Sequence, residues 1–361
     1  MRYPFAKAMI PALLAASLSG CLSLGPRSIE TGRVQFNKAI NESSSEQLLL
    51  NLVRLHYREL PYMLEVASVS QSMETNLSSS GSGTFPAVAP NTYGLGLGLG
   101  ISSKPTVTYT PLQGEQFVRQ MLTPISMERI ALLLNSGWSI SRTMRLVVQE
   151  INGLPNAPSA SGPTPANEPQ YREFLRVAHL LRELEIARQV SIVYAEDEVG
   201  ELRLSLAFAD KALETEAAKE VYSLLNLNTN VRTFALGTTA SSTSIRVLPR
   251  TMSGCLFYLS QAVETPNHHR LEGNATQTLS ADGTPFDWQE VMGDFMHIRN
   301  RSPWRGAPDA RIKVYYDGRW YYIDDSDLNS RSTFLLTQLL LSLQAGENKS
   351  TGPLLTLPVA R

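Results

Sequence analysis

The chain has 361 residues, with 32 Lys and Arg against 33 Asp and Glu, so its formal net charge is −1. A balance this close to neutral lacks the basic surplus typical of a nucleic-acid-binding protein, and we expect no nucleic-acid partner. Hydrophobic residues make up 43% of the chain, which is enough to bury a sizeable core.

The first 21 residues have the composition of an export signal. Arg2 and Lys7 form a positive start, and the run 8–18 is uncharged and apolar. This run is too short to cross a bilayer, which takes about 20 apolar residues. It ends in Leu18-Ser19-Gly20-Cys21, in which small residues precede a cysteine. This order of a positive, an apolar and a small-residue part is typical of a signal peptide.

The four residues that end at Cys21 resemble the lipobox of bacterial lipoprotein precursors. The resemblance implies a signal peptide over 1–20, cleavage before Cys21, and lipid attached to that cysteine at the start of a tether over 21–42. Two buried acyl chains already give stable anchoring to a membrane. Leu22 and Ser23 follow the cysteine, where similar lipoproteins kept at the inner membrane carry Asp. The resemblance therefore implies an outer-membrane location, anchored by lipid on the periplasmic side.

The sequence after the tether predicts a helix and then an extended segment. Ser43-x-x-Glu46 is a capping box, and it predicts a helix through Tyr57 with an apolar stripe over 48–55. Alternating polar and apolar residues predict a half-buried strand over 62–77. The Ser, Gly and Pro content of 78–90 predicts a flexible loop.

Glycine then alternates strictly with larger apolar residues from Tyr93 to Ile101. A glycine at every second position removes the side chains from one face of a strand. The opposite face carries Leu95, Leu97, Leu99 and Ile101, a candidate interaction surface. We expect 62–77 and 93–110 to form a long hairpin. Its aliphatic face is to be covered by the protein's own helices, by a second copy of the chain, or by the outer membrane.

Short helices are predicted over 114–122 and 126–136, and a longer one over 138–151, where Leu146-Val147-Val148 also fits a strand. The segment 152–169 is rich in Pro, Ser, Ala and Gly and predicts a linker. The linker divides the chain into an N-terminal lobe over 43–151 and a C-terminal lobe over 170–361, and we expect proteases to cut it first.

The second half alternates between strand and helix patterns. Two strands followed by a helix occur about three times, and a hairpin turn is predicted at Asp317-Gly318. The fold class is therefore α+β, with helices packed on small, mainly antiparallel sheets. The helices are predicted over 171–188, 210–225, 251–263 and 328–343, and the strands over 190–195, 202–208, 231–236, 244–248, 312–323 and 353–359.

No motif predicts catalysis, a cofactor or a metal. The nearest metal-like group is His268-His269 with Asp282, Asp287, Asp294 and His297, in a stretch typical of an exposed loop. The acidic cluster 324–327 suits the start of the last helix. Cys255 lies in an apolar helical stretch, and we expect it to be buried and inert. Trp320 and Tyr322 are a candidate binding surface for peptide, glycan or a partner protein.

Two function classes remain. The first is a non-enzymatic envelope lipoprotein, anchored at the outer membrane, that binds a partner or takes part in assembly, including self-association. The alternative is a periplasmic hydrolase that uses an acidic pair. Assays of peptidoglycan and ester hydrolysis would separate these two classes.

Overall fold

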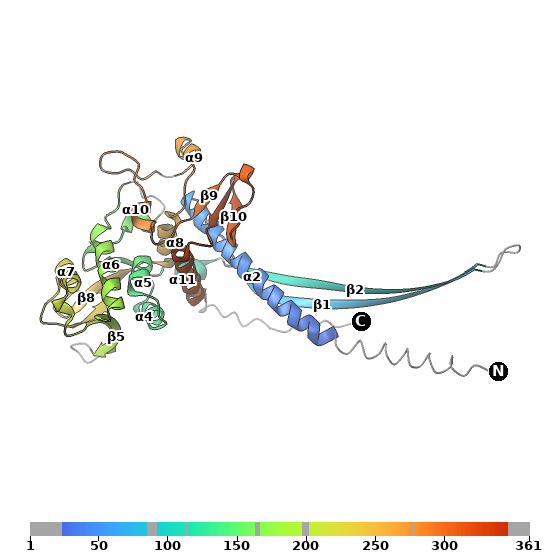
Figure 1. Cartoon of the computed structure of the whole chain (residues 1–361), viewed down its shortest axis with the longest axis horizontal. Helices are drawn as coiled ribbons and strands as arrows, with labels where there is room; N and C mark the ends of the chain where they lie inside the picture. The colour runs from blue at the N-terminus through green and yellow to red at the C-terminus, as the bar shows by residue number, and fades with distance from the viewer. Residues whose placement is uncertain are drawn as a thin grey trace. The chain divides into compact units, whose positions relative to one another are not determined.

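The computed structural model describes residues 24–84, 92–112, 114–162, 167–196, 202–275 and 277–345, and Figure 1 shows their elements. These residues fall into two compact units. The body contains 24–61 and 114–345, and the second unit is the hairpin 62–112. The fold is α+β, as predicted. The signal peptide, Cys21 and the predicted strand over 353–359 lie outside the described residues.

The helices of the body lie along the chain in the following order. They are α2 Leu24–His56, α3 Glu115–Leu122, α4 Met127–Asn135, α5 Ile140–Val147, α6 Arg172–Ile186, α7 Glu216–Leu224, α8 Met252–Ser260, α9 Asn267–Leu271, α10 Gln289–Met292 and α11 Leu328–Ala345, with short 3-10 turns η2 Pro158–Ser161, η3 Ala212–Glu214 and η4 Pro303–Arg305.

The strands form three sheets. The hairpin unit is the pair β1 Met63–Thr84 and β2 Thr92–Leu112. A six-stranded sheet has the order β4-β3-β8-β7-β6-β5, and a three-stranded sheet has the order β10-β11-β9. The strands of these two sheets are β3 Val148–Ile151, β4 Leu154–Pro155, β5 Val190–Glu196, β6 Leu202–Phe208, β7 Thr233–Gly237, β8 Ser244–Pro249, β9 Arg299–Arg301, β10 Ile312–Tyr316 and β11 Arg319–Ile323.

Helix α2 begins earlier than the capping box predicted. It runs unbroken from Leu24, so most of the predicted tether over 21–42 is helical. Proline is tolerated in the first turn, where Pro26 lies. The hydroxyl of Ser45 donates 2.8 Å to the carbonyl of Asn41, a bond typical of a serine inside a helix. The predicted apolar stripe within 48–55 is confirmed, since Leu48, Leu49, Leu52, Val53 and Leu55 are all buried, while Leu50 is half-buried.

The six-stranded sheet joins segments from both predicted lobes. Strand β3 pairs with β8, nearly one hundred residues later, and α5 ends where β3 begins. Both predictions for 146–148 were therefore partly right, because the helix passes directly into a strand. Helix α6 contacts α5 and α7 at this sheet (Figure 1).

The described parts of the predicted linker, 152–162 and 167–169, belong to the same compact unit as the chain on both sides of them. Asn156, Ala157 and Ala160 are fully buried inside the body. The side chain of Arg250, also fully buried, donates to the carbonyl of Asn156 and to the hydroxyl of Ser161. The predicted lobes over 43–151 and 170–361 are corrected accordingly. The second compact unit is the hairpin, and the Pro-rich segment lies within the body. Its buried polar bonds hold it there although its composition is typical of a loop.

The predicted loop over 78–90 is also corrected in part. Strand β1 continues to Thr84, and each of its residues from Ser78 onward has a partner on β2. Residues 85–91 lie outside the described part of the chain. Serine and glycine fit this strand because β2 pairs with it residue by residue from Ser78 to Thr84.

Candidate functional surfaces

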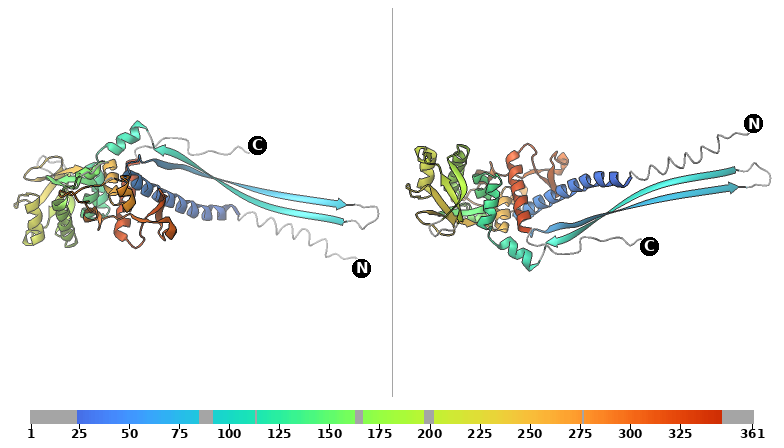
Figure 2. Two further views of the ribbon diagram at one scale, coloured as in Figure 1. Left: turned by 90° about the horizontal axis from the view of Figure 1, so that it is seen from above. Right: turned by 90° about the horizontal axis from the view of Figure 1, so that it is seen from below.

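The hairpin unit is a two-stranded ribbon of 22 and 21 residues. At about 3.3 Å per residue it is roughly 70 Å long. Figure 2 shows the two strands side by side and twisted along their whole length. The predicted hairpin is confirmed, and its register fixes which residues share a face.

One face of the ribbon combines glycine with small polar residues. Residues directly opposite each other in an antiparallel pair lie on the same face. Each glycine of the alternating run lies opposite a serine or an asparagine, in the pairs Gly94 and Ser82, Gly96 and Ser80, Gly98 and Ser78, and Gly100 and Asn76. This face therefore carries small residues on both strands.

The other face carries the four predicted aliphatic residues on one strand. Their partners on β1 are smaller or similar, in the pairs Leu95 and Gly81, Leu97 and Ser79, Leu99 and Leu77, and Ile101 and Thr75. We call residues 75–83 and 93–101 the uncharged ribbon, since Asp, Glu, Lys and Arg are absent from both. Glu74 and Lys104 lie just beyond its end.

The second predicted surface, Trp320 and Tyr322, lies on the three-stranded sheet of the body. Trp320 is opposite Tyr315 and Arg301, while Tyr322 is opposite Lys313 and Arg299. The two predicted residues therefore share one face, which adds three cationic side chains and a third aromatic ring. Both are half-buried, and the ring of Tyr315 lies edge-on to Trp320 at 5.2 Å between centroids.

The opposite face of this sheet holds a network that the sequence did not predict. The hydroxyl of Tyr57 lies 2.7 Å from the hydroxyl of Tyr321 and 2.7 Å from Nδ1 of His269. Burial raises the pKa of both tyrosines and lowers the pKa of His269, so the three groups are neutral at pH 7. Neutral phenols are poor nucleophiles and bases. The network joins the end of α2 to β11 and α9, which is a structural role.

His269, Asp294 and Asp282 of the metal-like group have other partners. His269 bonds to Tyr57, and Asp294 accepts two bonds from Arg145, the shorter at 2.8 Å. Asp282 accepts a bond from the hydroxyl of Thr284, which holds the pKa of this carboxyl below its ordinary value. Within the described residues, His, Cys, Asp and Glu do not form any group of three or more that could hold a metal ion.

The acidic cluster 324–327 is bound into local structure. Asp324 accepts hydrogen bonds from the hydroxyl and backbone of Ser326, which lower the pKa of this carboxyl. Asp325 pairs with Arg311 at 3.7 Å. Asp327 accepts from Ser330 at the start of α11. These contacts match the predicted capping role and leave the carboxylates engaged in structure.

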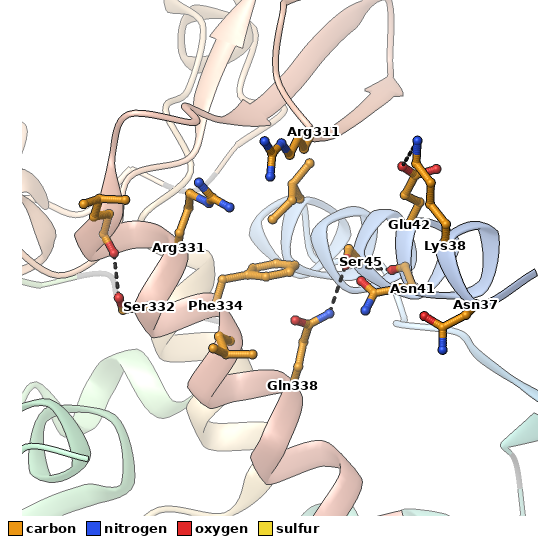
Figure 3. Close-up of a pocket in the computed structure, with 13 residues that line it drawn as sticks. Asn37, Lys38, Asn41, Glu42, Ser45, Arg311, Arg331, Ser332, Phe334 and Gln338 are labelled. Atoms are coloured by element: carbon orange, nitrogen blue, oxygen red, sulfur yellow. Dashed lines mark hydrogen bonds and ion pairs between the residues drawn. The ribbon is translucent and has the colours of Figure 1, made fainter. Parts of the chain in front are cut away.

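A groove of about 660 Å³ lies between α2, the start of β10 and α11. Figure 3 shows Gln338 bonded to Ser45 and Lys38 paired with Glu42. Gln338 donates 3.1 Å to the hydroxyl of Ser45, and Lys38 pairs with Glu42 at 3.7 Å. Arg331 donates to the carbonyl of Asp325. The groove thus contains internally paired groups and not a set of converging reactive ones.

Cys255 is buried in α8, as predicted, and burial raises the pKa of its thiol to about 12. A thiol with this pKa stays protonated and unreactive at neutral pH.

No described helix is both long and apolar enough to cross a membrane. Comparison with protein families, with curated proteins and with solved structures finds no match to this chain.

Proposed function

We propose that this protein is a non-enzymatic envelope lipoprotein, anchored through Cys21 on the periplasmic side of the outer membrane, that acts as a binding or assembly component. The observation that carries the proposal is the ribbon of β1 and β2, with its aliphatic residues on one face and small residues on the other. A two-stranded hairpin alone is marginally stable in water. A ribbon of this length therefore suits a role in which something else pairs with it or covers it.

The sequence of the first 21 residues supports the anchoring part of the proposal. The positive start, the short apolar run and Cys21 resemble a lipoprotein precursor. Three acyl chains would hold the protein at a membrane, since each buried CH2 contributes about 0.8 kcal/mol. An anchored protein whose two ribbon strands, among the described residues, pair only with each other fits an assembly role better than a diffusible protein does.

The anchor is tested with Cys21→Ser in cells fed labelled palmitate. We expect the variant to lose the label and to appear as precursor or as soluble periplasmic protein. Continued labelling and fractionation with the outer membrane would contradict the anchoring.

The assembly role is tested by chemical crosslinking of intact envelopes, followed by capture of the tagged full chain. We expect crosslinked species larger than the monomer for the native chain, and their loss with Leu97→Asp. The matched control is Val107→Asp, on the same strand and face but outside the uncharged ribbon. A native chain that is captured only as a monomer would contradict the role.

A further inference from the structure

As far as the described residues show, the uncharged ribbon has two open edges. Among the described residues, β1 pairs only with β2, so each strand has one neighbour in the sheet. About half of the backbone N–H and C=O groups of each strand point away from its neighbour. Such an edge is a template for pairing with another strand.

The features that normally protect an edge are confined to the other half of the hairpin. Natural sheets protect their edges with charged residues, prolines and β-bulges. In this hairpin the bulge lies between Val66 and Ser68, and Glu74, Lys104 and Pro105 all lie outside the uncharged ribbon. The uncharged ribbon has none of these features over nine consecutive residues of each strand. Within the described residues, the edges of the uncharged ribbon therefore lack this protection, whereas the rest of the hairpin has it.

We infer that the partner at these edges is another copy of this chain, with β2 of one copy pairing with β1 of the next. This rests on the proposed assembly function and names its partner. The pairing inside one chain already shows that the two strands are complementary. Leu97 lies opposite Ser79, and Gly98 lies opposite Ser78. If β2 of one copy pairs with β1 of the next in this same register, the aliphatic faces of the two copies join into one face. The small-residue faces join on the other side, and no charged residues are brought together.

The inferred contact also sets a size for the assembly. Each copy uses two different edges, which is a heterologous interface. A dimer formed in this way still has two open edges, so association continues until the edges close in a ring. We therefore expect a discrete oligomer of more than two copies. The protein is extracted from membranes in detergent, so that detergent covers the aliphatic face while the size of the oligomer is measured.

The inference is tested by co-expressing two differently tagged full chains and purifying one tag in detergent. We expect the second tag to co-purify, with a single molar mass above that of a dimer by light scattering. Leu97→Asp places a negative charge on the ribbon of every copy, and these charges repel one another when copies associate. We therefore expect at least a tenfold loss of the co-purified chain. Val107→Asp is expected to retain it.

Two measurements keep a folding defect apart from an assembly defect. The thermal midpoint of the body should be unchanged in Leu97→Asp, because the hairpin is a separate unit. Cysteines placed by Ser78→Cys and Gly98→Cys, which lie opposite each other, should still form a disulfide within one chain in the Leu97→Asp background. Loss of co-purification with both properties intact supports the inference.

Other outcomes overturn the inference. A native chain that is monomeric or dimeric in detergent, or a monomer that binds lipid vesicles through the ribbon, excludes edge pairing between copies. A lowered thermal midpoint in Leu97→Asp with unchanged co-purification would show that the body covers Leu97. If crosslinked partners other than this chain are lost with Leu97→Asp while the two tags never co-purify, the inference fails and the proposed function stands.

Discussion

The guanidinium carbon of Arg250 lies 3.9 Å from the centre of the Tyr258 ring, and both side chains are fully buried. The hydrogen bonds of this guanidinium go to neutral oxygens. It donates to the carbonyls of Arg145, Leu146, Val148 and Asn156 and to the hydroxyl of Ser161. Burial lowers the pKa of Arg250, and the π-face of Tyr258 together with these oxygens offsets the cost of burying the charge. One side chain thus joins α5, β3 and η2 to α8.

Replacement of this side chain is expected to destabilise the body. Arg250→Lys keeps a charge, but the single ammonium group of lysine cannot reach all the oxygens that the planar guanidinium contacts. Several buried carbonyls therefore lose their hydrogen-bond partners. We expect the free energy of unfolding to fall by about 3 kcal/mol in denaturant titrations. Arg246→Lys is the control, because Arg246 pairs with Glu150 at the surface and its loss should cost less than about 1 kcal/mol. Equal effects of the two substitutions would contradict the role of Arg250.

Limited proteolysis is expected to spare residues 152–162. Their Pro- and Ser-rich composition alone predicts early cleavage, but Asn156, Ala157 and Ala160 are buried and Arg250 holds the carbonyl of Asn156. A protease needs several residues of extended, accessible chain, so the first cuts should fall elsewhere. Mass spectrometry of the early fragments checks this. A first cut inside 152–162 in the native protein would show that this segment opens easily.

His56 is expected to make the stability of the body depend on pH. Burial lowers the pKa of His56 from 6.5 to about 4, and its two ring nitrogens contact the carbonyl of Ser260 and the hydroxyl of Thr265. The unfolded chain therefore binds a proton more readily than the folded one. The stability contributed by the neutral ring is present above pH 6.5 and is lost as the pH falls toward 4, by roughly 3 kcal/mol.

The measurement is the free energy of unfolding between pH 7 and pH 4. His56→Gln should lower stability at pH 7 and flatten the dependence in this window. An unchanged slope in His56→Gln would mean that another group controls it.

The turn between β10 and β11 offers a test of backbone strain alone. Asp317 and Gly318 have φ angles of 43° and 73°, in the left-handed region that favours glycine at the second position. No heavy atom of the described residues lies within 4 Å of where a Cβ on Gly318 would be, so Gly318→Ala adds strain without a clash. We expect a loss of about 1 kcal/mol. Gly237→Ala, equally open but without a positive φ, should be neutral or slightly stabilising. A similar loss in both variants would rule out strain at Gly318 as the cause.

The sequence determined the elements whose signals are local. The alternation of glycine and leucine predicted β2 and its two faces, because side chains alternate with period two on any strand. Ser126 and Thr251, which begin two of the predicted helices, act as caps, since each hydroxyl accepts a bond from the backbone three residues later. Ser139 does the same, one residue after the predicted start at Trp138. Asp317-Gly318 predicted the turn for the same local reason. These features need no information from distant parts of the chain.

Tertiary structure decided the features that depend on distant residues. Arg250 reaches carbonyls about one hundred residues earlier, and Tyr57 meets Tyr321 more than two hundred and fifty residues later. Buried hydrogen bonds of this kind made 152–162 part of the core although its composition predicts a linker. They also placed His269 in a neutral network. The hairpin is a separate unit because its two strands pair regularly with each other. The residue pattern of one strand does not reveal the register in which it pairs with another.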